Sequence, residues 1–235
     1  MIKLVDILNE GVYDPGIFKA VFTAGGPGSG KSYAASTLFG MPEKMPFVSA
    51  QGLKSVNSDK YFETYLQMKG ISQDIASLNP AEYEQAMMLR KKSKTVSQAA
   101  LKNYINGRLG LLIDGTGKDY AKISKQKKRL QDVGYDCFMV FVNTDLDVAL
   151  ERNQLRDRKL PSELVKSSWQ AVQNNMGKFQ SLFGRSNMLI VDNSEYKDFE
   201  DVVKKAANSF ITRKIQNPIA KAWIKKELEL RKKWV

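Results

Sequence analysis

The sequence predicts an α/β protein built on a parallel sheet that helices cover on both faces. Short continuous apolar runs alternate with helix-like segments along most of the chain, which is typical of strands that are buried on both faces. The first run leads into a glycine-rich turn, and several of the others end in polar residues. With 235 residues, 43% of them hydrophobic, the chain is long enough to bury such a core.

Five segments are expected to be strands, with helices between them. The strands are Phe18 to Gly25, a short run ending near Ser58, "LGLLIDGTG", "DCFMVFVNT" and "NMLIVDNS"; the helices are expected over 31–39, after 58, over 71–108, 119–133, 145–159 and 161–184, and over most of 197–235. The segment 71–108 breaks at "LNPAEY", where Asn79 can cap a helix and Pro80 can take its first position. In such sheets ligands bind beyond the carboxyl ends of the strands.

The chain is expected to divide into a leader over 1–16, a globular domain over 17–212 and a basic helical tail over 213–235. The tail holds eight basic and two acidic residues, so it carries +6 of the net charge of +12. The favoured interpretation is a terminal helix that packs on the domain with a solvated lysine face. A basic arm for nucleic acid or for a protein partner is the alternative.

Composition excludes several function classes. The chain has no histidine, which excludes His general bases, Ser-His-Asp triads and His-bound zinc. Its one cysteine, Cys137, allows no internal disulfide and favours a reducing, cytoplasmic compartment. No apolar run approaches about 18 residues, and the first residues lack the apolar core of a signal peptide, so no membrane partner is expected. The opening also resembles those of phage-encoded proteins.

The glycine-rich turn matches the P-loop pattern G-x-x-x-x-G-K-[ST] in full. It reads Gly25-Gly26-Pro27-Gly28-Ser29-Gly30-Lys31-Ser32. Such a loop surrounds phosphates with backbone N–H groups, and the helix that follows adds its positive end. Lys31 is expected to bind the β- and γ-phosphates of a nucleotide and Ser32 to bind Mg²⁺.

Two sequence elements that would indicate a GTPase or a hydrolytic ATPase are missing from the chain. The chain has no N-K-x-D element of the kind with which GTPases read their base, and Gly115 stands where a hydrolytic ATPase would have an acid after Asp114. Both absences favour a kinase, in which the phosphoryl group passes to an acceptor other than water.

Asp59 is the candidate for orienting the acceptor hydroxyl and accepting its proton, since it follows the second apolar segment. The alternative is that Asp59 caps the helix starting at Lys60, although Ser58 could cap instead. Glu63, four residues further and on the same helical face, is a second candidate for contacting substrate or metal.

Asp114 ends a strand and could hold Mg²⁺, directly or through water. Thr116 beside it offers a hydroxyl to the substrate. The alternative is an ordinary turn between strand and helix, in which Asp, Gly and Thr are frequent.

Three arginines follow the fourth strand in "VALERNQLRDRKLP". Arg152 and Arg156 are spaced to share a helix face, and Arg158 lies near the expected helix end. Guanidinium groups there could clamp donor phosphates and neutralise charge during phosphoryl transfer. In isolation, ion pairing on an exposed face would be the default interpretation.

The P-loop, "VNSDKYFE", "LLIDGTGKD", the "GYDCFMVFVNT" strand and "ALERNQLRDRKLP" together resemble the zeta-toxin-like P-loop kinases, which are related to polynucleotide kinase. The resemblance spans about Phe18 to Ser194. It implies a P-loop kinase fold, a five-stranded parallel sheet of adenylate-kinase-like strand order. It also implies ATP and Mg²⁺ at Lys31 and Ser32, a hydroxyl-activating Asp59, metal and substrate contacts at Asp114 and Thr116, and phosphate contacts from Arg152 with Arg156 or Arg158. The family motif usually continues from the aspartate into a basic residue, for which Lys60 is the only adjacent candidate.

The sequence therefore predicts an ATP- and Mg²⁺-dependent kinase for a hydroxyl group of a small metabolite, such as a nucleotide-sugar, nucleoside or nucleotide. Two alternatives stay open. One is a polynucleotide 5′-hydroxyl kinase, and the other is a non-enzymatic ATP-binding assembly or DNA-binding protein that uses the basic tail.

Overall fold

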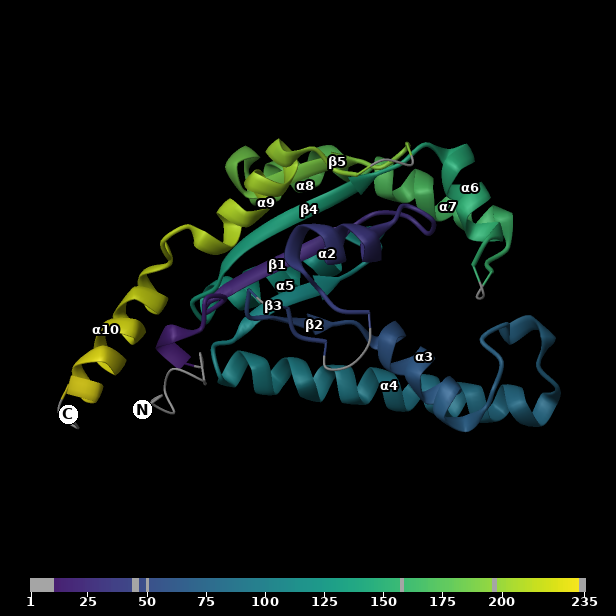
Figure 1. The fold of residues 1–235 in the computed structure, drawn as a ribbon, viewed down its shortest axis with the longest axis horizontal. Helices are drawn as coiled ribbons and strands as arrows, with labels where there is room; N and C mark the ends of the chain where they lie inside the picture. The colour runs from purple at the N-terminus through teal and green to yellow at the C-terminus, as the bar shows by residue number, and fades with distance from the viewer. Residues whose placement is uncertain (1–10, 44–46, 50, 157–158, 196–197, 233–235) are drawn as a thin grey trace.

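A five-stranded, all-parallel sheet forms the centre of the computed structural model, which describes residues 11–43, 47–49, 51–156, 159–195 and 198–232 (Figure 1). The strands are β1 (Lys19–Ala24), β2 (Leu53–Val56), β3 (Gly110–Asp114), β4 (Asp136–Asn143) and β5 (Met188–Asp192). Their order in the sheet is β2-β3-β1-β4-β5. The predicted five-stranded parallel sheet of adenylate-kinase-like order is thus confirmed.

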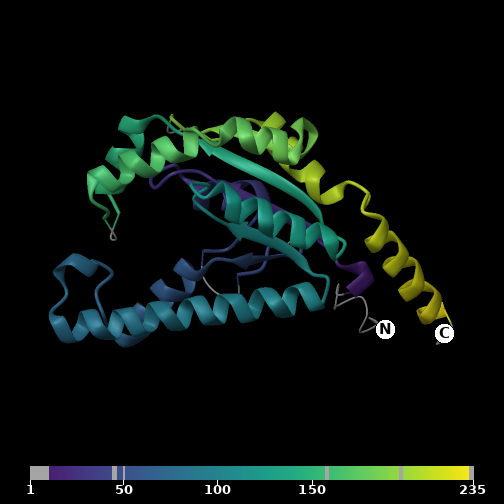
Figure 2. The same cartoon turned by 180° about the vertical axis from the view of Figure 1, so that it is seen from behind.

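Helices cover both faces of this sheet, as predicted. On one face lie α2 (Lys31–Phe39) and α9 (Asp201–Thr212); α5 (Tyr120–Asp132) and α8 (Met176–Phe183) lie on the other (Figures 1 and 2). Alternation along β1 explains the two cores, because neighbouring side chains of a strand point to opposite faces. Val21 packs with α2 and α9, while Phe22 packs with α5 and α8.

Helices α6 (Leu146–Gln154) and α7 (Ser162–Gln173) follow β4 at the carboxyl edge of the sheet. Short 3-10 turns are also present at η1 (Gly11–Tyr13), η2 (Ile75–Ser77) and η3 (Arg185–Asn187). Among the described residues, no helix has the length and apolar character needed to cross a membrane.

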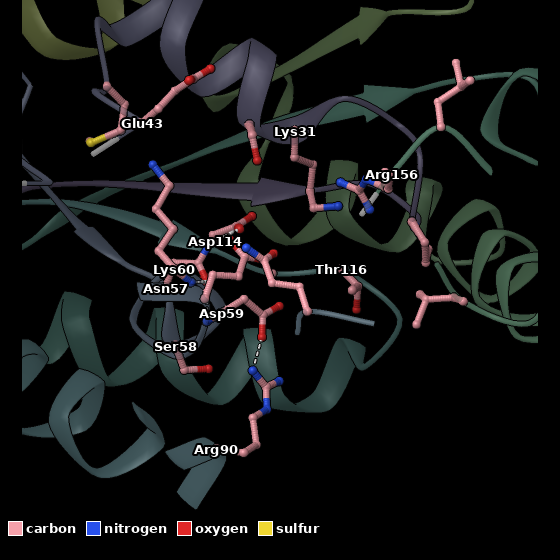
Figure 3. A pocket seen from close by; sticks show the side chains of 18 residues that line it. Lys31, Glu43, Asn57, Ser58, Asp59, Lys60, Arg90, Asp114, Thr116 and Arg156 are labelled. Carbon is pink, nitrogen blue, oxygen red and sulfur yellow. Dashed lines mark hydrogen bonds and ion pairs between the residues drawn. The ribbon is translucent and has the colours of Figure 1, made fainter. Parts of the chain in front are cut away.

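Two helices after β2 pack together as a projection from the sheet, while Leu101, Tyr104 and Ile105 near the C-terminal end of α4 pack against the main core. Helix α3 (Ser58–Lys69) packs against the long helix α4 (Pro80–Asn106) through a small core of Phe62, Leu66, Ile71 and Ala86. Asn79 and Glu82 form a capping box at the start of α4, with Pro80 in the first turn, as the sequence predicted. This packing places α4 along the side of the pocket described below (Figure 3).

The basic tail packs on the domain at the edge where β1 begins. Trp223 of α10 (Pro218–Lys232) meets Phe18 edge-on, with ring centroids 5.5 Å apart, and Ala220 is fully buried. The Asp136 carboxylate accepts hydrogen bonds from the backbone N–H groups of Gln216 and Asn217, at 2.8 and 3.0 Å. The tail therefore lies at the opposite edge of the sheet from the P-loop (Figure 1).

Candidate active site

The P-loop connects the end of β1 to the start of α2, and two of its glycines have backbone angles that other residues rarely adopt. Gly28 and Gly30 have φ values of +80° and +84°, where side chains are disfavoured. A Cβ on Gly28 would lie 2.2 Å from the carbonyl oxygen of Ala149 in α6, and one on Gly30 would lie 2.1 Å from Nδ2 of Asn193. The loop is therefore wrapped closely by the segments that follow β4 and β5.

Hydrogen bonds from these segments hold the loop in place. The Ser29 carbonyl oxygen accepts from Thr144 Oγ1 at 3.1 Å and from Asn193 Nδ2 at 2.8 Å. The hydroxyl of Ser29 is buried and has no hydrogen-bond partner within the described part of the chain. A buried polar atom without a hydrogen bond costs free energy. The loop therefore has a hydrogen-bonding group that the described part of the protein does not use.

Lys31 Nζ donates to the loop carbonyls of Gly25 and Gly26, at 2.8 and 3.1 Å. Burial lowers the pKa of Lys31 from its usual value, and the nearby Asp114 carboxylate acts in the opposite direction. The ammonium group is thus held at the mouth of the loop, where a phosphate would compensate its loss of hydration.

Seven of the predicted site residues line one pocket of about 600 Å³ beside this loop (Figure 3). They are Lys31, Ser32, Asp59, Glu63, Asp114, Thr116 and Arg156. Two further candidates, Arg152 and Gly30, line an adjacent pocket of about 630 Å³ together with Tyr33 and Arg156. The residues that follow separate strands in the sequence therefore meet at the carboxyl edge of the sheet.

Asp114 is held by hydrogen bonds from both sides. Thr23 is its neighbour in the register of β1 and β3, and Thr23 Oγ1 donates to Asp114 Oδ1 at 2.8 Å. Asn57 Nδ2 donates to Asp114 Oδ2 at 2.5 Å. These two donors fix the carboxylate at the floor of the pocket.

Asp59 does not cap its helix, and neither does Ser58. The cap is Asn57, whose Oδ1 accepts from the backbone N–H groups of Asp59 and Lys60, at 2.7 and 3.4 Å. The capping alternatives raised from the sequence are therefore wrong, because a polar residue one position earlier has the extended backbone of an N-cap. The Asp59 side chain instead turns into the pocket and pairs with Arg90 (Figure 3).

The arginine segment differs from the prediction. Helix α6 ends at Gln154, so Arg156 lies in a bend beyond it and does not share a helix face with Arg152. The side chain of Asn153, which is fully buried, explains this ending: it bonds both the N–H and the carbonyl of Leu160, at 3.1 and 2.8 Å, and turns the chain back. Arg158 lies outside the described residues.

Arg152 and Arg156 consequently point to different places. Arg152 Nη1 donates to the Asn193 carbonyl at 2.6 Å, which ties α6 to the segment after β5. Arg156 lies on the wall between the two pockets and contributes its charge near Lys31.

The donor set suits a hard cation such as Mg²⁺. The described residues contain no group of three or more His, Cys, Asp or Glu side chains that could enclose a metal. Mg²⁺ in nucleotide sites usually needs only one or two protein ligands, with phosphates and water completing its shell. Ser32, which is exposed, and Asp114 face the same pocket and supply such oxygens.

Sequence reasoning missed Asn57 and Arg90. Asn57 carried a signal, because it begins the run Asn-Ser-Asp ahead of a helix and asparagine is a strong N-cap. Arg90 carried none, since it lies 31 residues from Asp59 in the sequence and looks like part of a solvated lysine-rich face.

The chain was then compared with known proteins. A family model described as zeta toxin matches residues 14–204. A search of curated protein sequences found no match.

Solved structures with the same fold include the AvrRxo1-ORF1:AvrRxo1-ORF2 complex with sulphate ions, at TM-score 0.56 and 14% identity, over 77% of this chain and 56% of that chain. The same complex with ATP has TM-score 0.54 and 15% identity, over the same shares. This chain thus spans a little over half the length of those relatives. A structure of the PezAT chromosomal toxin-antitoxin system of the human pathogen Streptococcus pneumoniae has TM-score 0.50 and 13% identity, over 90% and 86%.

The identities are too low for the solved structures to show more than the fold. The family model is more specific, because its match covers residues 14–204 of 235 and includes the P-loop, Asp59, Asp114 and the α6 segment. The chain therefore belongs to the zeta toxin family.

Proposed function

We propose that the protein transfers the γ-phosphoryl group of ATP, with Mg²⁺, to a hydroxyl group of a small metabolite such as a nucleotide-sugar, nucleoside or nucleotide. The observation that carries this proposal is the meeting of Lys31, Asp114 and Asp59 in one pocket of about 600 Å³. A phosphate-binding cation, a metal-binding carboxylate and an acceptor-orienting carboxylate are the groups that phosphoryl transfer to an alcohol requires.

Each group has a defined task in this reaction. The P-loop amides and Lys31 bind the donor phosphates, while Arg156 and Arg152 neutralise charge on them from the side of α6. Mg²⁺, when bound at Ser32 and Asp114, would neutralise charge on the β- and γ-phosphates. Asp59 accepts the hydrogen bond of the acceptor hydroxyl, orients its oxygen toward the γ-phosphorus and takes its proton as the new P–O bond forms. The bond from the γ-phosphorus to the bridging oxygen breaks in the same step, and ADP leaves.

The acceptor would bind between the P-loop and the α3–α4 projection. Glu63 and Thr116 offer hydrogen-bond acceptors and a donor to a polar molecule, and the pocket volume is in the range for a small-molecule ligand. ATP as the donor and a free thiol at Cys137 both suit the reducing cytoplasm.

The assembly alternative would use the basic tail, whereas a polynucleotide kinase would have to bring its 5′-hydroxyl to the same pocket as a small acceptor. The basic tail packs at the edge of the sheet opposite the pocket, so its charge does not contribute to acceptor binding at Asp59. We therefore treat nucleic-acid binding by the tail as a property separate from phosphoryl transfer.

The test is incubation with γ-labelled ATP and Mg²⁺ against a metabolite extract, purified UDP-N-acetylglucosamine and 5′-hydroxyl oligonucleotides. We expect label in a small molecule, and loss of that label in Asp59→Asn with ATP affinity kept within about twofold. Label in the oligonucleotide would favour the polynucleotide alternative. ATP binding without any labelled acceptor would contradict the kinase proposal and favour the assembly alternative.

A further inference from the structure

Helix α4 contributes a single side chain, Arg90, to the wall of the pocket among the described residues. Its guanidinium group pairs with Asp59 (Figure 3) and lies over the ring of Phe62, 5.1 Å from the ring centroid. Phe62 is 2% exposed and belongs to the small core between α3 and α4. The direction from which Arg90 approaches Asp59 is therefore determined by packing within the projection.

The backbone of Asp59 is fixed independently of Arg90. Asn57 Oδ1 accepts from its N–H at 2.7 Å, and the same amide side chain bonds Asp114. A continuous line of polar contacts thus runs from Thr23 through Asp114, Asn57 and Asp59 to Arg90. It joins the metal-binding end of the pocket to the acceptor end, and α4 forms its far anchor.

We propose that Arg90 is a positioning residue, which holds the Asp59 carboxylate in the orientation that receives the acceptor hydroxyl. This inference rests on the proposed kinase function. An aspartate side chain has few rotatable bonds, so fixing its backbone through Asn57 and one carboxylate oxygen through Arg90 leaves it little freedom. Orientation of this kind matters because a small misplacement of a reacting group can cost about 100-fold in rate.

The pair has little to contribute to folding. The Asp59 and Arg90 side chains are 42% and 29% exposed, and ion pairs with that much contact with water stabilise proteins only weakly. The hydrocarbon stem of Arg90 and its contact with Phe62 are the parts with structural value. Arg90→Met keeps an unbranched apolar stem and removes the guanidinium group, so it separates the two roles.

The first experiment measures steady-state transfer with labelled ATP, Mg²⁺ and the acceptor labelled in the panel above. We expect Arg90→Met to lower kcat by about 10- to 100-fold, with the dissociation constant for ATP and the melting temperature nearly unchanged. Arg90→Lys should recover part of kcat because it restores the charge. Lys92→Met is the matched control: Lys92 lies on the same helix over Tyr65, outside the pocket, and this change should leave kcat as in the wild type.

A double-mutant cycle with Asp59→Asn locates the effect. In that background Arg90→Met should change the residual rate by less than about twofold, since the group that it positions is gone. Equal losses in both backgrounds would show that Arg90 acts on substrate, which overturns the inference. Wild-type kcat in Arg90→Met also overturns it, whereas unchanged transfer in Asp59→Asn would refute the proposed function itself.

Crystal structures of the wild type and Arg90→Met provide a test that needs no turnover. We expect the Asp59 side chain to leave its wild-type orientation in the variant while Asn57 and the α3 backbone stay in place. An unmoved Asp59 carboxylate would contradict the positioning role even if activity were lost.

Discussion

Gly28→Ala tests whether the P-loop is wrapped by α6 as the structure indicates. At Gly28, φ is +80°, and an added Cβ would lie 2.2 Å from the Ala149 carbonyl oxygen and 2.9 Å from Ala149 Cα. These are backbone atoms of a helix, so they cannot move aside as a flexible side chain would. Either the P-loop or the start of α6 must shift.

The expected cost follows from two contributions. A left-handed backbone costs an L-residue about 1–2 kcal/mol, and overpacking of a tight contact costs about 1–3 kcal/mol. Gly28→Ala should therefore lower the free energy of unfolding by about 2–5 kcal/mol, which for a chain of this size corresponds to about 4–20 °C in melting temperature.

Gly70→Ala is the matched control. Gly70 follows α3 with φ +65°, and a Cβ there would meet nothing within 4 Å, so it reports the backbone contribution alone. Urea denaturation and ATP titration of both variants measure the difference. If Gly28→Ala is no less stable than Gly70→Ala and binds ATP as the wild type does, the close packing of α6 on the loop is refuted.

Three further outcomes are expected. Asn57→Ala should lose about 0.5–2 kcal/mol of stability with its helix cap and should weaken Mg²⁺-dependent ATP binding, because Asp114 loses a donor; equal urea midpoints for variant and wild type would contradict the capping role. Burial raises the pKa of Cys137 from 9.0 to about 12. Cys137 should therefore resist a disulfide reagent at pH 8 until the protein is unfolded, and its contribution to stability should fall as pH rises above 9, where only the unfolded chain loses the proton. Rapid native-state labelling would argue against this burial. Trp223→Ala, at a half-buried contact with Phe18, should cost about 2–4 kcal/mol with ATP affinity unchanged, since α10 is at the far edge of the sheet; a loss of ATP affinity without loss of stability would contradict that placement.

Much of the fold was predictable because it depends on local patterns. Continuous apolar runs mark strands that are buried on both faces, and the glycine spacing of the P-loop reports backbone angles that few other residues adopt. The capping box at Asn79 was likewise readable, since its partners lie three residues apart.

The prediction was wrong where a distant contact outweighed a local preference. The "ALERNQLRDRK" segment has helical composition, yet α6 stops at Gln154 because the buried Asn153 side chain binds Leu160 instead of solvent. Asp59 and Ser58 were both reasonable N-caps, but α3 begins at Ser58, so Asn57 is the N-cap. The Asp59 side chain is therefore available to the pocket.

By itself, the sequence determined that the chain carries a P-loop on an α/β frame, because the residues of that loop are contiguous from Gly25 to Ser32. Only the tertiary structure decided which side chains face that loop. Asp59, Asp114 and Arg90 come from α3, β3 and α4, and they meet because parallel strands end at one edge of the sheet and because Phe62 packs α4 against α3. Such meetings depend on packing between elements far apart in the chain, which no local pattern of residues encodes.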